Sequence, residues 1–114
     1  MNSNIVAPVY KAYKLKEVLS EGKNLYLLDV REPEEYELTH ISGSDLVPMM
    51  EIDSRIDDID DKIRTASSTI VICRSGQRSE VVTEYLLHKG YENVFNLEGG
   101  LIEYSKFDSS VKVY

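Results

Sequence analysis

Short runs of consecutive apolar residues alternate along the chain with segments in which apolar residues recur every three or four positions. Runs of the first kind are typical of strands covered on both faces, and segments of the second kind are typical of amphipathic helices. The pattern predicts strands at residues 9–13, 25–30, 45–48, 70–72 and 93–97. It predicts helical segments at residues 15–21, 33–39, 79–89 and 101–107, and in part of 50–64.

Strands that alternate with helix-length connections predict a mostly parallel sheet with helices on both faces. The expected fold class is therefore α/β, with a three-layer α/β/α architecture. A chain of 114 residues is long enough for one domain with a substantial core. We expect one domain over residues 1–114, with a ragged start at 1–8 and a polar tail at 108–114. No signal peptide and no apolar run near transmembrane length is recognised.

The central apolar run, Ile70 to Ile72, leads directly to Cys73, the only cysteine of the chain. A short polar loop follows and enters a predicted helix. Backbone N–H groups in such a loop, together with the positive end of a helix dipole, can form an anion site. Arg74 and Arg78 add positive charge, so the thiolate form of the cysteine is favoured. Such a sulfur is suited to attack on an anionic sulfur or phosphorus compound.

A competing interpretation makes Cys73 a small buried core residue, which is the commoner fate of a lone cysteine after an apolar strand. The two nearby arginines favour the nucleophile, because a core cysteine has no need of them. A second strand end also carries polar residues, since Asp29 and Arg31 close the run at 25–30. In an open parallel sheet, the carboxyl ends of the central strands are where ligands bind. Arg31 is thus expected near the cysteine loop if the two strands are neighbours.

Composition narrows the choice of partners and compartments. The net charge of −7 argues against nucleic acids and anionic membranes, because both require a basic face. One cysteine excludes an internal disulfide and a multi-cysteine metal site, and no metal site is predicted. A free thiol without a partner indicates a reducing, cytoplasmic setting. The two histidines, His40 and His88, are interpreted as structural residues.

At this point the sequence resembles the single-domain rhodanese-like sulfurtransferases. Four motifs carry the resemblance, in this order along the chain: 28–36 (LDVREPEEY), 40–43 (HISG), 73–79 (CRSGQRS) and 96–100 (NLEGG). Each motif alone is weak, and the four in order are specific. The resemblance covers residues from about 15 to 104 and implies a five-stranded parallel sheet in the order 1-5-4-2-3.

The resemblance also implies a mechanism. Cys73 would attack the outer sulfur of a donor such as thiosulfate, become a persulfide, and pass that sulfur to cyanide, a thiol or a protein cysteine. No metal or organic cofactor is implied. The implied substrate-binding residues are Arg74, Ser75, Gly76, Gln77, Arg78, Ser79 and Arg31, with Asp29 in a supporting role. Arg31 and Asp29 are expected to orient the loop more than to take part in the chemistry.

Two other functions remain as alternatives. One is a binding or sulfur-carrier module that acts with a protein partner. The other is a cysteine phosphatase of the dual-specificity kind, which requires Cys-x5-Arg to enclose a phosphate. Here the spacing from Cys73 to Arg78 is Cys-x4-Arg, a tighter ring that disfavours phosphatase activity. Ser42 stands where the family often has proline, and Tyr104 where it often has tryptophan; both are expected to affect packing only. The loop sequence also differs from that of the two-domain sulfurtransferases, so the sulfur donor stays open.

Overall fold

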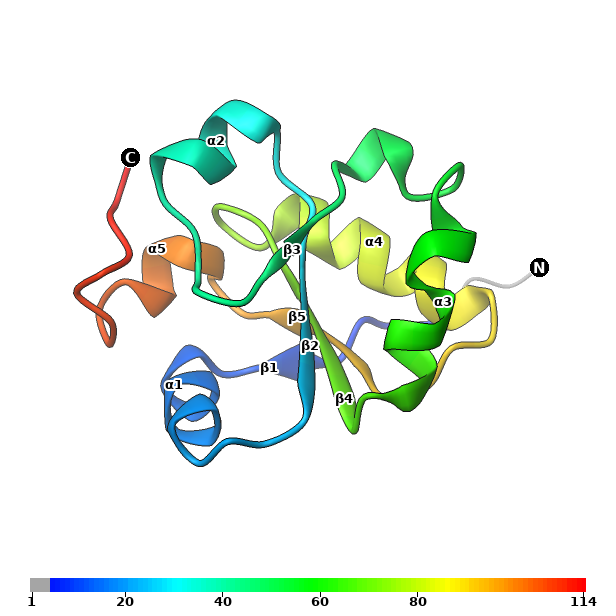
Figure 1. Cartoon of the computed structure of the whole chain (residues 1–114), viewed down its shortest axis with the longest axis horizontal. Coiled ribbons are helices and arrows are strands. Elements are labelled where there is room, and N and C mark those ends of the chain that lie inside the picture. Colours follow the sequence, from blue (N-terminus) through cyan, green and yellow to red (C-terminus); the bar gives the residue numbers. More distant parts are fainter. Residues whose placement is uncertain (1–4) are drawn as a thin grey trace.

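The computed structural model describes residues 5–114, which form one five-stranded sheet flanked by helices (Figure 1). The strands run in the spatial order β1-β5-β4-β2-β3, and every neighbouring pair is parallel. Their bounds are β1 Val9–Tyr10, β2 Leu25–Asp29, β3 Asp45–Leu46, β4 Ser68–Ile72 and β5 Val94–Leu97. The predicted fold class, the parallel sheet and its strand order are confirmed.

Helices cover both faces of the sheet, as the alternating pattern requires. In Figure 1, α1 and α5 lie on one side, and α3 and α4 lie on the other. The short α2 follows β2 at the carboxyl edge of the sheet (Figure 1). The helical bounds are α1 Ala12–Ser20, α2 Pro33–Leu38, a 3-10 turn η1 Met49–Glu51, α3 Ile56–Thr65, α4 Gln77–His88 and α5 Gly100–Tyr104.

The packing of β4 explains why its sequence is apolar without interruption. Ile70, Val71 and Ile72 are all fully buried. Successive side chains of a strand point to opposite faces, so Val71 packs with the α3 and α4 core while its two neighbours pack with the α1 and α5 core. A helix layer on each face is therefore what allows three consecutive β-branched residues in this strand.

Several element boundaries differ from the sequence-based expectation. The helix expected at Ser79 begins at Gln77, and α1 begins at Ala12 where Leu15 was expected. Part of 50–64 is a 3-10 turn, and the last helix ends at Tyr104. The early start of α4 matters most, because it makes Gly76 the N-cap and Ser79 the third residue of the helix. Backbone N–H groups at these positions have no partner within the helix.

Described residues near both ends of the chain, within 5–8 and 108–114, pack onto the domain. Residues 1–4 of the predicted ragged start lie outside the described residues, but Ala7 is buried and the carbonyl of Pro8 accepts a hydrogen bond from Asn96 N–H at 2.8 Å. The polar tail expected at 108–114 packs back onto the domain. Val111 is 3% exposed, and Lys112 N–H donates to Thr39 Oγ1 at 2.9 Å. Buried apolar surface and a long-range hydrogen bond thus hold the segment that was expected to be a polar tail.

Over residues 5–114, no helix combines the length and the apolar character needed to cross a lipid bilayer.

Candidate active site

The cysteine loop lies at the carboxyl edge of the sheet, directly after β4. Two backbone hydrogen bonds join the loop to α5. Leu101 N–H donates to Cys73 O at 3.0 Å, and Ile102 N–H donates to Arg74 O at 3.1 Å. Gly100 makes this close approach possible. A Cβ there would lie only 2.5 Å from the carbonyl carbon of Arg74 and 2.6 Å from Cys73 O. The last glycine of the NLEGG motif therefore lets the backbone of α5 pack directly against the backbone of the cysteine loop.

Three hydrogen-bonding groups converge on the sulfur of Cys73. Gly76 N–H donates to Sγ at 3.1 Å, and Ser79 N–H donates to it at 3.3 Å. Ser79 Oγ lies 3.1 Å away. Both backbone donors come from the N-cap and first turn of α4, where the helix dipole favours negative charge. Cys73 is buried, at 1% exposure, so the two N–H donors and the Ser79 hydroxyl surround a sulfur that lies inside the loop.

Arg78 is bound to Glu35 of α2 and closes the loop from its outer side. Its two terminal nitrogens donate to the Glu35 carboxylate at 2.7 and 3.0 Å. These hydrogen bonds lower the pKa of Glu35 to about 2, supported by the Glu32 N–H and the Tyr114 hydroxyl. The same contact raises the pKa of Arg78. The guanidinium thus fixes the position of α2 against the loop and remains partly exposed.

Arg31 is fully buried and forms an ion pair with Asp29 at 2.8 Å. Its Nε also donates to Asp29, and its terminal nitrogens donate to Glu35 O, Thr39 O and the Tyr114 hydroxyl. All five donors of the guanidinium have acceptors in this arrangement. The guanidinium therefore has no donor left over for a substrate in this arrangement. The substrate-binding role of Arg31 and the orienting role of the pair stay predictions.

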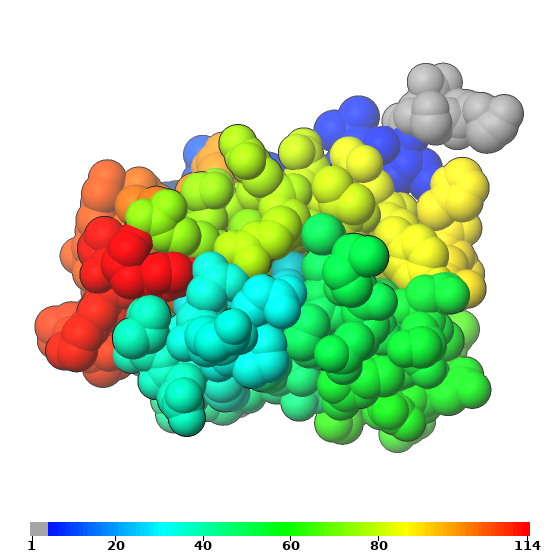
Figure 2. Space-filling model, turned by 90° about the horizontal axis from the view of Figure 1, so that it is seen from above, coloured from blue at the N-terminus to red at the C-terminus, as the bar shows by residue number. Residues whose placement is uncertain are grey.

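The C-terminal segment reaches the same site. Figure 2 looks onto the carboxyl edge, where the C-terminal residues lie beside the cysteine loop and α2. Arg74 Nε donates to the main-chain oxygen of Tyr114 at 2.8 Å, and its guanidinium lies over the Tyr114 ring at 5.1 Å. The Tyr114 hydroxyl donates to Glu35 at 2.8 Å. Tyr114 consequently links Arg31, Glu35 and Arg74 in one network.

The remaining loop residues have distinct positions. Ser75 and Gln77 are exposed at the outer surface of the loop. Gly76 has φ +99°, a conformation that favours glycine, and its carbonyl accepts a hydrogen bond from Asn96 Nδ2 at 3.0 Å. The structure thus brings the whole 73–79 segment together around one sulfur, with Arg31 and Asp29 in the layer behind it.

Sequence reasoning did not assign site roles to Glu35, Asn96 and Tyr114. Asn96 carried a usable signal, because a lone amide in the buried strand β5 requires hydrogen-bond partners. Glu35 and Tyr114 carried none, since one is a glutamate in an acidic helix and the other lies in a polar segment. The ring of His40 stacks on that of Tyr36, with 3.8 Å between the ring centroids, and His40 Nδ1 lies 2.7 Å from the Tyr36 carbonyl oxygen. These contacts agree with the structural role expected for His40.

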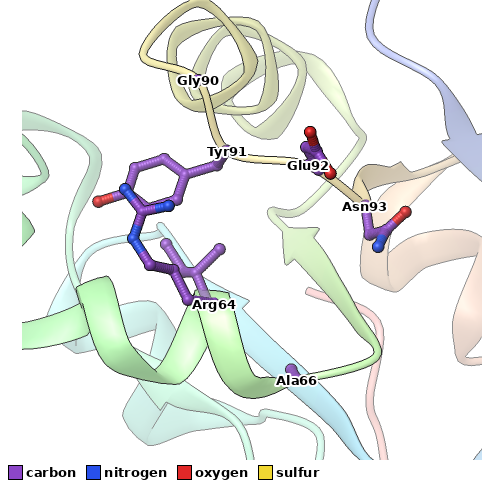
Figure 3. Close-up of a pocket in the computed structure, with 7 residues that line it drawn as sticks. Arg64, Ala66, Gly90, Tyr91, Glu92 and Asn93 are labelled. Atoms are coloured by element: carbon purple, nitrogen blue, oxygen red, sulfur yellow. The ribbon is translucent and has the colours of Figure 1, made fainter.

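A separate hollow lies at the opposite, amino edge of the sheet (Figure 3). Its volume is about 310 Å³, and Arg64, Tyr91, Glu92 and Asn93 are among its lining residues. In Figure 3 the Arg64 guanidinium lies against the Tyr91 ring. Both side chains also hydrogen-bond Asp60.

Within residues 5–114, no three histidine, cysteine or acidic side chains group closely enough to hold a metal ion.

Comparison with known proteins is consistent across sequence and structure. A family model described as "Rhodanese-like domain" matches residues 11–107. Among curated relatives, the chloroplastic Rhodanese-like/PpiC domain-containing protein 12 of Arabidopsis thaliana is 36% identical over 89 residues, which are 77% of this chain and 30% of the relative. The putative sulfur carrier protein YrkF of Bacillus subtilis is 31% identical over 90 residues, covering 79% of this chain and 46% of the relative. The chain thus spans less than half the length of these two proteins.

Two solved structures are also similar. A rhodanese-related protein from Thermoplasma volcanium superposes with a TM-score of 0.78 at 27% identity, covering 94% of this chain and 99% of that one. Thiosulfate sulfurtransferase from Pseudomonas aeruginosa gives a TM-score of 0.79 at 28% identity, covering 94% of this chain and 20% of that one.

Proposed function

This chain belongs to the rhodanese-like domain family, and from that premise we propose that it moves sulfane sulfur through a persulfide on Cys73. In the first half-reaction, the Cys73 thiolate attacks the outer sulfur of thiosulfate or a similar anionic donor. An Sγ–S bond forms, the sulfur–sulfur bond of the donor breaks, and sulfite leaves with the bonding electron pair. In the second half-reaction, a thiophilic acceptor attacks the outer sulfur and Cys73 returns to the thiolate.

The observation that carries this proposal is the convergence of two backbone donors, Gly76 N–H and Ser79 N–H, on Cys73 Sγ. Hydrogen bonds to an ionised group stabilise it, and the N-terminus of α4 adds a favourable dipole. A structural cysteine would need none of these donors. In a persulfide the negative charge moves to the outer sulfur, and the N–H groups at the start of α4, which have no partner within the helix, are suited to hold it.

Within this proposal Arg78 shapes the loop, because its guanidinium is bound to Glu35. Ser75 and Gln77 are the exposed loop side chains that an incoming donor or acceptor meets first. The Asp29–Arg31 pair acts behind the loop as a support. We also propose an anionic sulfur donor such as thiosulfate, a thiophilic acceptor, and a reducing, cytoplasmic setting for the reaction.

A second candidate is a sulfur carrier that accepts sulfur on Cys73 and releases it only to a protein partner. The relative named as a putative sulfur carrier favours it, together with the larger size of both curated relatives. The low exposure of Cys73 also favours an acceptor that docks on the loop. Phosphatase activity is disfavoured, because the short Cys-x4-Arg ring and the engagement of Arg78 with Glu35 leave little for a phosphate to bind.

The test is intact-protein mass spectrometry after brief incubation with thiosulfate, for the natural chain and for Cys73→Ser. We expect the natural chain to gain one sulfur atom and to lose it on addition of cyanide, with thiocyanate formed. The Cys73→Ser chain should gain nothing.

The outcomes separate the candidates. Sulfur gain that cyanide and small thiols cannot remove would favour the carrier. No gain, with Cys73 also inert to alkylating agents, would contradict both. Hydrolysis of an aryl phosphate that depends on Cys73 would overturn the ranking in favour of a phosphatase.

A further inference from the structure

The hydroxyl of Ser79 has one proton and two neighbouring groups that can accept it. Cys73 Sγ lies 3.1 Å from Ser79 Oγ on one side, and Asn96 Oδ1 lies 2.5 Å from it on the other. The three side chains are buried, with Asn96 at 6% exposure and Ser79 fully buried. Because a hydroxyl donates only one hydrogen bond, the sulfur and the amide compete for the same proton.

A second contact fixes which end of the amide faces the serine. Asn96 Nδ2 donates to the carbonyl oxygen of Gly76 at 3.0 Å. With the amide reversed, its oxygen would face that carbonyl, and two acceptors would be in contact. The Asn96 oxygen therefore points at Ser79, and the short contact between them requires the serine to be the donor.

The position of the Ser79 proton decides which form of Cys73 the hydroxyl stabilises. While Ser79 donates to Asn96, its oxygen offers only lone pairs to the sulfur. That arrangement suits a thiol, which donates its S–H to Ser79, and it is repulsive to a thiolate. A thiolate gains the Ser79 hydrogen bond only when the hydroxyl turns away from Asn96.

We propose that Asn96 is a positioning residue that competes with Cys73 for the Ser79 proton and so limits the thiolate fraction of the cysteine. The inference rests on the proposed persulfide chemistry for its role in turnover. The hydroxyl turns to the sulfur when the thiolate forms, and the cysteine proton passes to solvent. It returns to Asn96 when Sγ bonds a second sulfur and the negative charge moves to the outer atom.

This competition favours sulfur transfer in a specific way. A thiolate that holds every nearby donor is stable and correspondingly less nucleophilic, because nucleophilicity falls as stabilisation rises. By keeping the Ser79 proton partly engaged, Asn96 leaves the attacking sulfur less stabilised than its persulfide product. Asn96 thus tunes both half-reactions without contacting the donor or the acceptor.

Charged groups around the loop also act on the sulfur. Asp29 is paired with Arg31 behind the loop, and Arg78 is paired with Glu35 of α2. Arg74 donates to the main-chain oxygen of Tyr114. None of these pairs includes Asn96 or the Ser79 hydroxyl. Substitution of Asn96 therefore leaves them in place, and its effect on the sulfur can be separated from theirs.

Alkylation of Cys73 with iodoacetamide across a pH series tests the competition directly. The chain has one cysteine, so intact mass reports on that residue alone. We expect Asn96→Leu to lower the midpoint of the alkylation profile by about one pH unit, because a hydrogen bond from Ser79 to the thiolate becomes permanent. In a Ser79→Ala background, the same substitution should leave the midpoint unchanged.

The double-mutant cycle separates this competition from a structural role. If Asn96 acted only through the Gly76 backbone, its substitution would shift the midpoint equally in both backgrounds, and that result would overturn the proposal. No shift, or an upward shift, with Ser79 present would overturn it as well. Thr83→Val is the matched control, since it removes a buried hydrogen bond to Ser79 O without touching the sulfur, and its midpoint should stay that of the natural chain.

A second variant, Asn96→Asp, tests the same competition if Asn96→Leu does not fold. Asn96→Asp keeps the shape and strengthens the acceptor, so the midpoint should rise more with Ser79 present than in the Ser79→Ala background. An equal rise in the two backgrounds would contradict the competition. Because alkylation needs no sulfur donor, a chain that transfers no sulfur still reports on the Ser79 proton, and the two proposals fail independently.

Discussion

The two edges of the sheet contain similar residue types and differ in what the fold does with them. At the carboxyl edge, α4 and α5 begin, and their first turns donate hydrogen bonds to Cys73 and to the loop backbone. At the amino edge, α3 and α4 end, around the hollow in Figure 3. Both edges have an arginine close to a tyrosine ring, Arg74 with Tyr114 and Arg64 with Tyr91.

Strand direction accounts for the difference. In a parallel sheet with helical connections, every helix starts at the carboxyl edge, so free N–H groups and positive dipole ends gather there. The amino edge receives helix C-termini, which repel an anion. One arginine at each edge shows a further contrast: the Arg31 side chain is 0% exposed in a buried ion pair, and that of Arg64 is 58% exposed.

The largest expected effect comes from breaking the buried ion pair. Arg31→Met leaves the buried Asp29 carboxylate with the backbone N–H of residue 31 but without its cationic partner, and should lower the free energy of unfolding by about 3–5 kcal/mol. Arg64→Met, at the exposed edge, should have a much smaller effect. Urea unfolding followed by circular dichroism measures both. Similar losses for the two variants would contradict the distinction between the edges.

The next effect concerns glycines in the left-handed region. Gly100 has φ +59°, and a Cβ there would meet the Cys73 and Arg74 backbone, so Gly100→Ala should cost about 3 kcal/mol of stability. Gly90 has φ +100° at the amino edge, and nothing lies within 4 Å of a Cβ added there. Gly90→Ala should therefore cost only the conformational strain, about 1 kcal/mol. Urea unfolding of the two variants measures these costs, and equal losses would mean that backbone strain, rather than the contact with the loop, makes Gly100 necessary.

The smallest expected effect is a pH dependence at the carboxyl edge. The pKa of Glu35 is lowered from 4.5 to about 2, mainly by Arg78, so the native state favours its carboxylate. Its contribution to stability is fully present above about pH 4.5 and is lost as the pH falls toward 2. Glu35→Gln should lower the unfolding free energy by about 1–2 kcal/mol near neutral pH, with a difference that disappears in strong acid.

Urea unfolding of the natural chain and Glu35→Gln over a pH series measures that difference. Glu92→Gln, at the exposed amino edge, is the control and should keep the pH dependence of the natural chain. A difference between Glu35→Gln and the natural chain that stays constant down to low pH would show that the carboxylate of Glu35 is not the group responsible.

The sequence by itself determined the elements and the place of the cysteine. The apolar runs of β2, β4 and β5 and the helical spacing between them predicted the α/β class, because burial on two faces requires that pattern. The four motifs then predicted the strand order, which the structure confirms. The catalytic role of Cys73 stays a prediction.

Only the tertiary structure decided which polar groups meet at that cysteine. Glu35 is 43 residues from Arg78 and 79 residues from Tyr114, and no local pattern relates them. Asn96 reaches Ser79 and Gly76 because β5 lies beside β4 in the sheet. Side-chain periodicity reports which face of an element is buried. The partners of a buried charge or amide depend on distances across elements, and those exist only once the sheet is assembled.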